Sequence, residues 1–157
     1  MKKVSITLTR YNEENDLVRP CLLALSKQKF VGAEVYFFDQ KEDRRMKEFC
    51  SKISNKNIRL VYKKIPAKSL SHARNIGIKT SKTDIVLFID CDAIPDKKWA
   101  FNLAKVFELD KRIAIVGGRS NPKWLKKPRW FHNSNIAREV YSLIDLSEKI
   151  IETSRIV

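Results

Sequence analysis

Two aspartates, Asp90 and Asp92, follow a run of five apolar residues, 85–89, that reads as a buried strand. Like charges one residue apart on an extended segment repel each other unless a cation lies between or beside them. A hard divalent cation resolves this cost, and Mg²⁺ and Mn²⁺ commonly keep waters and bind substrate phosphates as further ligands. The spacing therefore favours a metal site at which Asp90 and Asp92 meet a phosphorylated substrate.

A solvated loop that caps the next helix is the alternative interpretation of so short a motif. Two neighbours favour the binding site instead, namely the apolar strand before Asp90 and Pro95 after the motif. Ligands of open α/β sheets bind beyond the carboxyl ends of the strands, which is where the two aspartates are expected. Cys91 between them is predicted to be a buried packing residue rather than a nucleophile.

Two further strand ends carry polar or aromatic residues that suit a ligand. Tyr11 follows the first predicted strand and can stack on a planar base, while Thr9 and Glu13 can hydrogen-bond to a base or ribose edge. Asp39 lies at the end of the second predicted strand. Taken singly, Tyr11 fits a half-buried packing residue and Asp39 fits a turn former. Together with Asp90, these residues indicate a binding site at one end of a sheet.

The elements that must position these residues alternate along the chain. Short apolar runs predict strands, and apolar residues at helical spacing predict helices between them. The predicted strands are 4–8, 33–38, 58–62, 84–90 and 113–118, and the predicted helices lie around 17–25, 46–53, 69–81 and 99–107. Pro20 is expected to restart or kink the first helix, and Ala73 and Gly77 are small enough to let the third pack closely on the sheet. The alternation predicts an α/β sandwich with a mostly parallel sheet.

The composition limits the class of protein and its partners. The 157 residues suffice for one domain with a core, and 32 Lys and Arg against 18 Asp and Glu give a net charge of +14, which favours anionic partners. Cys21, Cys50 and Cys91 form neither a disulfide framework nor a zinc-ligand pattern, so we expect a reducing cytoplasm. The N-terminus is a poor signal peptide and no apolar run is long enough to cross a bilayer, so any membrane contact is expected to be peripheral.

Four segments together resemble one known family. They are "LTRYNEEN" from residue 8, the strand that ends in Asp39, the block Ala73-Arg74-Asn75-x-Gly77 followed by a strand and the two aspartates, and "IAIVGGRSNP" from residue 113. In this combination the chain resembles, over almost its whole length, the family 2 glycosyltransferases of the GT-A fold. The resemblance implies a three-layer α/β/α sandwich and a metal-assisted, inverting sugar transfer from a nucleotide-sugar donor.

The resemblance also implies roles for single residues. Thr9, Tyr11 and Asp39 would hold the uracil or other base, Glu13 would lie near the ribose, Arg74 would approach the nucleotide, Asp90 would contact the ribose or the metal, and Asp92 would ligate Mn²⁺ or Mg²⁺ at the diphosphate. The cation then offsets the charge that builds on the departing nucleoside diphosphate. One departure leaves the identity of the base open: Gln40 and Lys41 follow Asp39, where many relatives have an acidic residue and a small polar turn.

These residues predict a glycosyltransferase that moves a sugar from a nucleotide-diphosphate donor, with a UDP-sugar favoured, to a glycan or lipid-linked acceptor. We expect it in the cytoplasm or at the inner face of the membrane, in the synthesis of a glycan such as a cell-envelope polysaccharide. Residues 1–118 are predicted to form the donor-binding domain. Residues 119–157, a basic aromatic loop and a helix, are predicted to start an incomplete acceptor-side half, so the chain alone is expected to transfer sugar weakly or not at all.

Two features of that second segment stay open. Trp124 and Trp130 stand among lysines and arginines, which suits either a membrane interface or a flexible loop whose tryptophans pack on the core. The carboxylates of Asp145, Glu148 and Glu152 read as the solvated face of an amphipathic helix within 136–151 and just beyond it. No catalytic base is therefore assigned, although an inverting transfer needs one to deprotonate the acceptor hydroxyl.

Other classes of protein are open alternatives. A nucleotide-sugar-binding remnant would keep the donor site and have lost transfer, and a basic nucleic-acid-binding protein would use the positive charge alone. The sequence lacks a recognition-helix pattern, zinc-ligand spacing and an aromatic RNA-binding strand, so nucleic acid is not the expected partner. A nucleotidyltransferase is disfavoured as well, since no glycine-rich basic loop follows the first strand.

Overall fold

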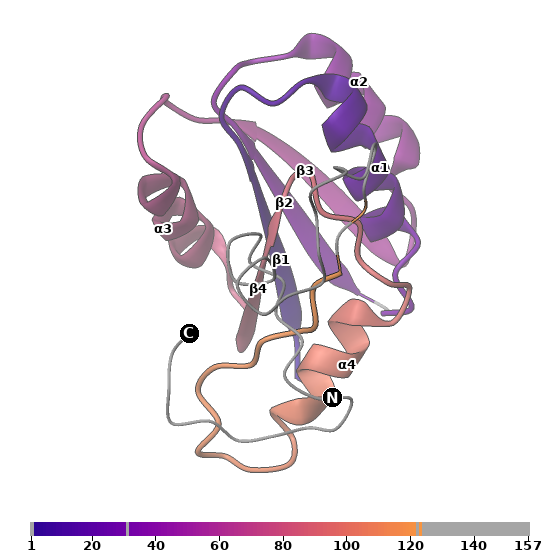
Figure 1. Ribbon diagram of the computed structural model, residues 1–157, viewed down its shortest axis with the longest axis vertical. Coiled ribbons are helices and arrows are strands. Elements are labelled where there is room, and N and C mark those ends of the chain that lie inside the picture. The colour runs from indigo at the N-terminus through magenta and orange to yellow at the C-terminus, as the bar shows by residue number, and fades with distance from the viewer. Residues whose placement is uncertain (1, 31, 122, 124–157) are drawn as a thin grey trace, which may run out of the picture. The chain divides into compact units, whose positions relative to one another are not determined.

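The computed structural model describes residues 2–30, 32–121 and 123 (Figure 1). The chain divides into two units, 1–114 and 115–157, and every described helix and strand belongs to the first. The helix predicted within 136–151, the two tryptophans of the basic loop and the three unassigned carboxylates lie outside the described residues.

Four parallel strands form one sheet, in the order β3-β2-β1-β4. The strands are β1 Val4–Arg10, β2 Ala33–Asp39, β3 Ile58–Lys64 and β4 Ile85–Asp90. The strand β1 lies between two neighbours, with Thr9 in register with Phe38 on one side and with Asp90 on the other. Because all four strands run the same way, the carboxyl ends of β1, β2 and β4 meet at one end of the sheet, and the predicted parallel α/β arrangement is confirmed.

Helices cover both faces of the sheet, so the domain has three layers (Figure 1). The helices α1 Asn15–Ser26, α2 Arg44–Ile53 and α4 Trp99–Val106 share one apolar core with the sheet, and α3 Leu70–Thr80 packs on the opposite face. The strand β1 is buried along its whole length, and its alternate residues Val4, Ile6 and Leu8 belong to the larger core. The expected α/β/α sandwich is therefore present.

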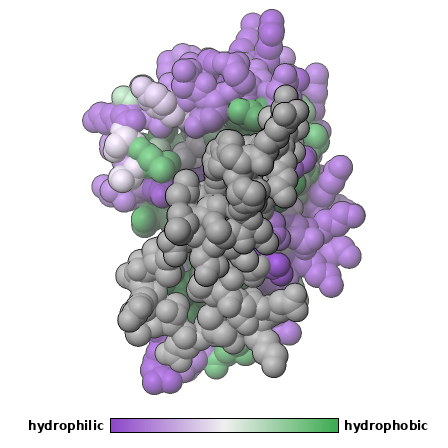
Figure 2. All heavy atoms as spheres, in the orientation of Figure 1, coloured by the Kyte–Doolittle hydropathy of each residue, from purple (hydrophilic) through white to green (hydrophobic). Residues whose placement is uncertain are grey.

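The described surface is mostly hydrophilic in the orientation of Figure 2. Exposed large apolar side chains such as Leu17, Ile78 and Phe88 come from three different elements rather than from one stripe. Scattered apolar side chains of this kind are normal on globular domains. Within the described part of the chain, no helix is both long enough and apolar enough to cross a membrane.

Two sequence expectations differ from the structure. The fifth strand predicted at 113–118 is wrong, since these residues have no regular secondary structure. Apolar content alone suggested that strand, but a strand also needs a neighbour for its hydrogen bonds, and the glycine pair that ends the run weakens it further. Of the two effects expected at Pro20, a restart or a kink of the first helix, the restart is wrong. Pro20 lies inside one continuous helix, α1, whose buried apolar face holds it against the sheet despite the missing N–H.

The helix α3 lies very close to the sheet at Gly77. A Cβ atom built on Gly77 would come within 2.5 Å of Cγ2 and 2.7 Å of Oγ1 of Thr7, on the central strand β1. Ala73, one turn earlier, is fully buried on the same side. The prediction that two small residues allow close packing of this helix is confirmed.

Gly77→Ala should therefore destabilise the fold, although alanine has the higher helix propensity. The added methyl group has to displace the side chain of Thr7 or the helix itself, and overpacking of this kind costs roughly 1–3 kcal/mol in free energy of unfolding. Urea unfolding followed by circular dichroism measures the change. The control Lys79→Ala, at an exposed position of the same helix, should change the free energy by less than about 0.5 kcal/mol. Equal or higher stability of Gly77→Ala would contradict the close packing.

Candidate functional site

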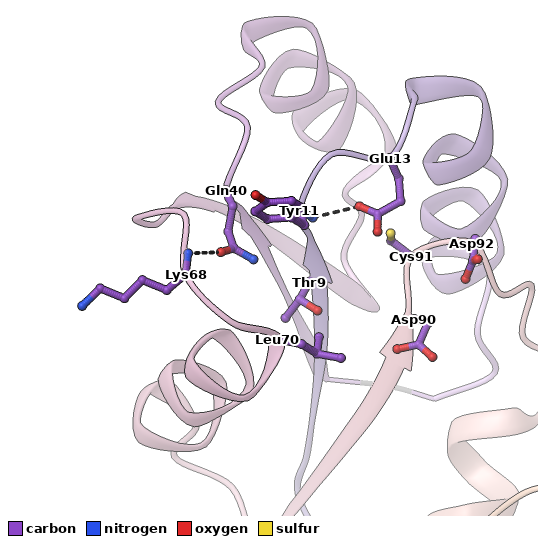
Figure 3. Close-up of a pocket in the computed structure, with 9 residues that line it drawn as sticks. All are labelled: Thr9, Tyr11, Glu13, Gln40, Lys68, Leu70, Asp90, Cys91 and Asp92. Carbon is purple, nitrogen blue, oxygen red and sulfur yellow. Dashed lines mark hydrogen bonds between the residues drawn. The ribbon is translucent and has the colours of Figure 1, made fainter.

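A pocket of about 460 Å³ lies at the carboxyl ends of the strands (Figure 3). Its walls come from the ends of β1 and β4, from the segments that follow β1, β2 and β4, and from the start of α3 with the segment before it. The lining residues are Thr9, Tyr11, Glu13, Gln40, Lys68, Leu70, Asp90, Cys91 and Asp92. Five of the residues singled out from the sequence, Thr9, Tyr11, Glu13, Asp90 and Asp92, are thus brought together at one place.

The two aspartates differ in their hydrogen bonds to other described residues. Asp90 is the last residue of β4, and its Oδ1 accepts a hydrogen bond from Nη2 of Arg74 at 3.0 Å. The side chains of Arg74 and Asp90 are 41% and 65% exposed, so solvent weakens this ion pair. Asp92 lies in the turn that follows, is exposed, and has no hydrogen-bond partner among the described residues. Both carboxylate oxygens of Asp92 are therefore available to a ligand.

Protein side chains alone do not complete a metal site at this pocket. Within the described part of the chain, no group of three or more His, Cys, Asp or Glu side chains is placed to hold a metal ion. Asp90 and Asp92 supply hard carboxylate oxygens, and Mg²⁺ or Mn²⁺ takes its remaining ligands from water and substrate phosphates. The two aspartates thus fit a metal that binds together with a phosphorylated ligand.

Glu13 shapes the loop after β1. Its carboxylate accepts hydrogen bonds from the backbone N–H groups of Tyr11 at 2.8 Å and of Asn12 at 3.1 Å. Burial works to raise the pKa of Glu13, but these N–H groups, its own N–H and the Cys91 thiol outweigh burial and lower the pKa below the usual range. Glu13 is therefore a fixed anion in the pocket wall, with the exposed Tyr11 ring beside it (Figure 3).

Cys91 links this loop to the turn that carries Asp92. Its thiol contacts the Glu13 carboxylate, and the residue is only 3% exposed. Burial, together with the charges of Glu13 and Asp92, raises the pKa of the Cys91 thiol well above its usual value. A buried thiol of raised pKa is a poor nucleophile, which agrees with the packing role predicted from the sequence.

Asp39 and Gln40 face different sides because successive side chains of an extended segment alternate. Asp39 is fully buried and does not line the pocket. Gln40 lines it instead, and its Oε1 accepts a hydrogen bond from the backbone N–H of Lys68 at 2.6 Å (Figure 3). The side-chain NH₂ of Gln40 has no partner in the described part of the chain. The sequence analysis missed Gln40, since alternation requires that one of two neighbours faces the pocket but does not say which.

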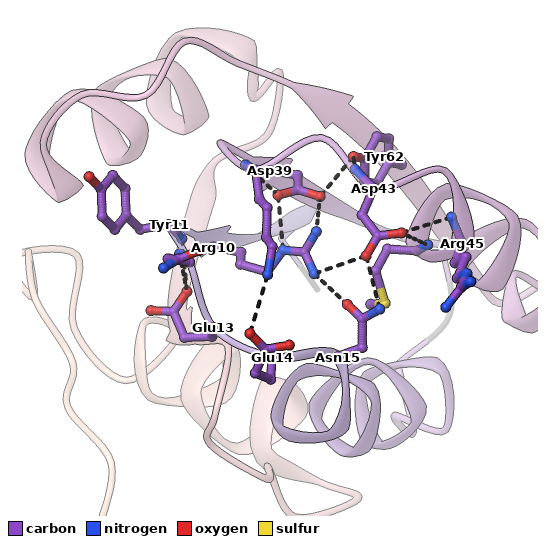
Figure 4. A network of polar contacts seen from close by, with 12 residues as sticks. Arg10, Tyr11, Glu13, Glu14, Asn15, Asp39, Asp43, Arg45 and Tyr62 are labelled. Carbon is purple, nitrogen blue, oxygen red and sulfur yellow. Dashed lines mark hydrogen bonds and ion pairs between the residues drawn. The ribbon is translucent and has the colours of Figure 1, made fainter.

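A buried ion pair joins the ends of β1 and β2 (Figure 4). Arg10 and Asp39 are register partners, both side chains are 0% exposed, and Nε of Arg10 donates to Oδ1 of Asp39 at 2.9 Å while Nη2 donates to Oδ2. Asp39 also accepts from the Tyr62 hydroxyl at 2.7 Å and from the backbone N–H of Lys41 at 2.9 Å. Burial works to lower the pKa of Arg10, but Asp39 outweighs burial and raises it. Each charge is therefore stable in the interior only because the other is present.

The network continues to the amino ends of α1 and α2. Nη1 of Arg10 donates to Oδ1 of Asn15, the first residue of α1, at 2.6 Å. Asn15 in turn donates to Oδ2 of Asp43 at 2.9 Å, and Asp43 caps α2 by accepting from the backbone N–H groups of Arg45 and Met46. The network thus fixes where both helices start relative to the strand ends that border the pocket.

Two of the residues predicted from the sequence, Asp39 and Arg74, do not line the pocket. Arg74 contacts the pocket wall through Asp90, and Asp39 precedes the glutamine that lines it. Lys68, from the segment before α3, and Leu70, the first residue of α3, line the pocket without a signal that the sequence analysis recognised. The binding roles expected for all of these residues stay predictions.

Comparison with known proteins places the chain in one family. A model of glycosyl transferase family 2 matches residues 5–154. A chondroitin synthase of Escherichia coli is 24% identical over 117 residues, which are 74% of this chain and 17% of that protein. Glycosyltransferase GlyA of Streptococcus pneumoniae is 26% identical over 154 residues, which are 96% of this chain and 22% of that protein. The chain therefore spans less than a quarter of the length of these two relatives.

Solved structures show the same fold. The S. aureus TarS 1–349 structure in complex with UDP has a TM-score of 0.61 and 23% identity, covering 77% of this chain and 38% of that one. The mannosyltransferase PcManGT from Pyrobaculum calidifontis, in complex with GDP-Man and Mn²⁺, has a TM-score of 0.56 and 20% identity, covering 68% of this chain and 32% of that one. These likenesses confirm the GT-A type of fold that the sequence resemblance implied.

Asp43→Asn should lower the free energy of unfolding near neutral pH by about 1 kcal/mol, because asparagine still caps α2 but lacks the charge that faces Arg10. Burial works to raise the pKa of Asp43, but the Asn15 hydrogen bond, the backbone N–H groups of α2 and the charge of Arg10 lower it. The contribution of a carboxyl with a lowered folded-state pKa is present above its unfolded pKa of about 4 and is lost as the pH falls through the folded-state value.

Urea unfolding of wild type and Asp43→Asn at about pH 7 and about pH 3 tests this linkage, and the difference between them should shrink at the lower pH. Glu48→Gln removes an exposed charge from the same helix and is the matched control, with an expected change below about 0.5 kcal/mol. A difference between Asp43→Asn and wild type that stays constant across the pH range would show that the charge of Asp43 does not act in this way.

Proposed function

Because the chain belongs to glycosyl transferase family 2, we propose that it forms the donor site of a sugar transferase that uses a nucleotide-sugar, with a UDP-sugar favoured. The observation that carries this proposal is the pocket at the carboxyl ends of β1 and β4, which gathers the Tyr11 ring and the carboxylates of Asp90 and Asp92. An aromatic ring can stack on the base, and paired carboxylates can bind the diphosphate through a divalent metal. Two proteins of the same fold were solved with UDP and with GDP-Man and Mn²⁺.

The base binds at the end of the pocket that carries Tyr11, Thr9 and Gln40. Tyr11 is exposed and offers its ring face, and Thr9 offers a hydroxyl from the end of β1. The Oε1 atom of Gln40 is already occupied by the N–H of Lys68, so its NH₂ group is the part that faces a ligand as a donor. A donor at this place suits a base carbonyl such as those of uracil. Asp39, held by Arg10, acts on the base through the position of the neighbouring Gln40.

The ribose and the diphosphate bind at the end that carries the aspartates. Asp92 would hold Mn²⁺ or Mg²⁺ at the diphosphate, Asp90 would contact the ribose or share the metal, and Glu13 would lie near the ribose; the carboxylates of all three line the pocket. When bound, the cation supplies a Lewis acid that offsets the charge on the departing nucleoside diphosphate. Arg74, placed by Asp90, adds a positive charge on the nucleotide side.

The transfer inverts the anomeric carbon and uses a glycan or lipid-linked acceptor in this proposal. Residues 1–118 provide the donor side, and residues 119–157 begin the acceptor side. The net charge of +14 supports an anionic acceptor or surface, including the inner face of a membrane in the cytoplasm. Among the described residues we assign no catalytic base.

UDP together with Mn²⁺ should raise the melting temperature of the chain, because a ligand that binds only the folded state stabilises it. At a free UDP concentration of about a hundred times Kd the stabilisation is about 2.7 kcal/mol, which corresponds to a shift of roughly 5–10 °C for a chain of this size. EDTA should remove the shift, since in this proposal Asp90 and Asp92 would hold the diphosphate through a divalent metal. Differential scanning fluorimetry with UDP, with GDP and without nucleotide measures the effect and distinguishes the two bases.

Asp92→Asn should abolish the shift and leave the melting temperature without ligand nearly unchanged, because the Asp92 side chain has no partner among the described residues. Asp16→Asn removes an exposed carboxylate from the first turn of α1 and is the matched control, which should keep the full shift. A shift that Asp92→Asn retains, or one that needs no divalent metal, would overturn the role of the aspartates. The absence of any shift with UDP or GDP would overturn the donor site, and binding without sugar transfer would identify a remnant.

Gln40→Ala should weaken UDP binding by roughly tenfold, because one hydrogen bond to the base is lost. Gln40→Glu should weaken it at least as much, since a carboxylate has no donor and repels a base carbonyl. Isothermal titration calorimetry in Mn²⁺ measures both values of Kd. Lys41→Gln changes the next residue, whose side chain pairs with Glu14, and should bind UDP like wild type. Identical Kd values for wild type and Gln40→Ala would rule out contact between Gln40 and the base.

A further inference from the structure

A second cavity, of about 640 Å³, lies at the opposite end of the sheet from the donor pocket. It is formed by the segment between α1 and β2 and by the segment between α2 and β3, so it borders the amino ends of β2 and β3. Its lining includes Lys27, Lys29, Phe30, Lys56 and Asn57. We propose that this cavity binds a phosphate-bearing ligand through its three lysines, independently of the donor site.

The charge of the cavity is uncompensated. Its described lining contains no carboxylate, and Lys27, Lys29 and Lys56 are all exposed and form no ion pair with another described residue. Asp96 contacts this wall only through its backbone carbonyl, and its carboxylate accepts from the backbone N–H of Lys98 at 2.8 Å. An anion that enters the cavity therefore meets ammonium groups that do not first have to leave another partner.

The carbonyl end of α1, which would repel an anion, is neutralised by hydrogen bonds. The Ser26 hydroxyl donates to the carbonyl of Leu23 at 2.9 Å, and the Lys27 N–H donates to that of Ala24 at 3.3 Å. The Gln28 N–H donates to the carbonyl of Leu25 at 3.2 Å, and the Asn55 side chain donates to that of Ser26 at 3.0 Å. The last four carbonyls of the helix thus have donors, and the lysines determine the sign of the field in the cavity.

The amide side chains of Gln28 and Asn55 hold the backbone of the cavity walls through hydrogen bonds. Gln28 is 5% exposed, and its Nε2 donates to the carbonyl of Asp96 at 2.6 Å while its Oε1 accepts from the N–H of Ala100 at 3.0 Å. On the other wall, Oδ1 of Asn55 accepts from the N–H groups of Asn57 at 3.0 Å and Ile58 at 3.1 Å. The backbone that carries the lysines is therefore held in place before a ligand arrives.

Lysines also lie near the amino ends of the other strands of the sheet. A lysine precedes each strand by four residues or fewer: Lys3 before β1, Lys29 before β2, Lys56 before β3 and Lys82 before β4. Asp84 also precedes β4, but it accepts a hydrogen bond from the backbone N–H of Lys3 at 3.3 Å. The carboxylates of the donor pocket lie at the other end. The lysines at the amino ends therefore add to the positive field around the lysine cavity.

A phosphate-bearing ligand fits this cavity better than a carboxylate of similar size. Lysines act as point charges without fixed geometry, and three of them around one cavity suit a group that carries more than one negative charge. The cavity is much larger than one phosphate, and buried Phe30 offers an apolar wall for the rest of the molecule. A soluble phosphorylated molecule and a phospholipid headgroup share this chemistry.

The test titrates inorganic phosphate into the full chain in EDTA, so that no metal holds the anion at the donor pocket. Backbone chemical shifts from ¹H–¹⁵N spectra should change, in a saturable way, around residues 27–30 and 56–57. The double variant Lys29→Gln and Lys56→Gln should raise Kd at least about tenfold, because both charges act on one anion. The matched control, Lys79→Gln and Lys105→Gln, removes two exposed lysines from α3 and α4 and should keep the wild-type Kd.

Sodium chloride at equal ionic strength separates specific binding from screening. Vesicles of phosphatidylcholine with and without about 20% phosphatidic acid identify the source of the phosphate. Phosphate binding without vesicle binding supports a soluble ligand, whereas binding to the phosphatidic acid vesicles that the double variant loses supports a headgroup. Shifts that chloride reproduces, shifts confined to the donor pocket, or equal Kd values for the double variant and wild type would overturn the proposal.

Discussion

The ion pair between Arg10 and Asp39 is the interaction on which the candidate site depends most. Two fully buried charges at the ends of neighbouring strands are tolerable only if each is paired and hydrogen-bonded. Tyr62 of β3 and the backbone N–H of Lys41, in the loop after β2, supply further partners of Asp39. Asn15 ties the pair to α1, and Asp43 ties it to α2. These contacts restrict the backbone conformation just after Arg10 and Asp39. The next residue in each case, Tyr11 and Gln40, lines the pocket.

Because side chains alternate along a strand, the supporting network and the pocket lie on opposite sides of the sheet. Arg10 and Asp39 belong to the side that supports the fold, whereas Thr9 and Asp90, which are register partners, both line the pocket. A support network and a binding surface can therefore occupy the same strand ends without competing for the same side chains. The Cys91 thiol completes the arrangement by joining Glu13 to the turn of Asp92, so that the two walls of the pocket are linked through a buried contact.

Much of this arrangement was predictable from the sequence, because it follows from period and position. The apolar run before Asp90 predicted the strand β4 and the place where it ends. The spacing of Ala73 and Gly77 predicted that α3 packs closely on the sheet. What could not be predicted depends on contacts between distant segments. The partner of Asp39 is Arg10, which no local pattern reveals, and the choice of Gln40 for the pocket follows from that pairing. The strand expected at 113–118 failed for the related reason that an apolar run does not specify a neighbour.

The contact between Gly77 and Thr7 also affects the placement of a charged side chain beside the pocket. Arg74 lies three residues before Gly77 on the same rigid helix, and its guanidinium meets Asp90 on the strand next to Thr7. The contact at Gly77 fixes how close α3 lies to β1. Because Arg74 belongs to α3 and Asp90 to β4, the close approach of α3 to the sheet brings the backbone positions of this charge pair together. A glycine that does not line the pocket thus helps to position a side chain that contacts the pocket wall.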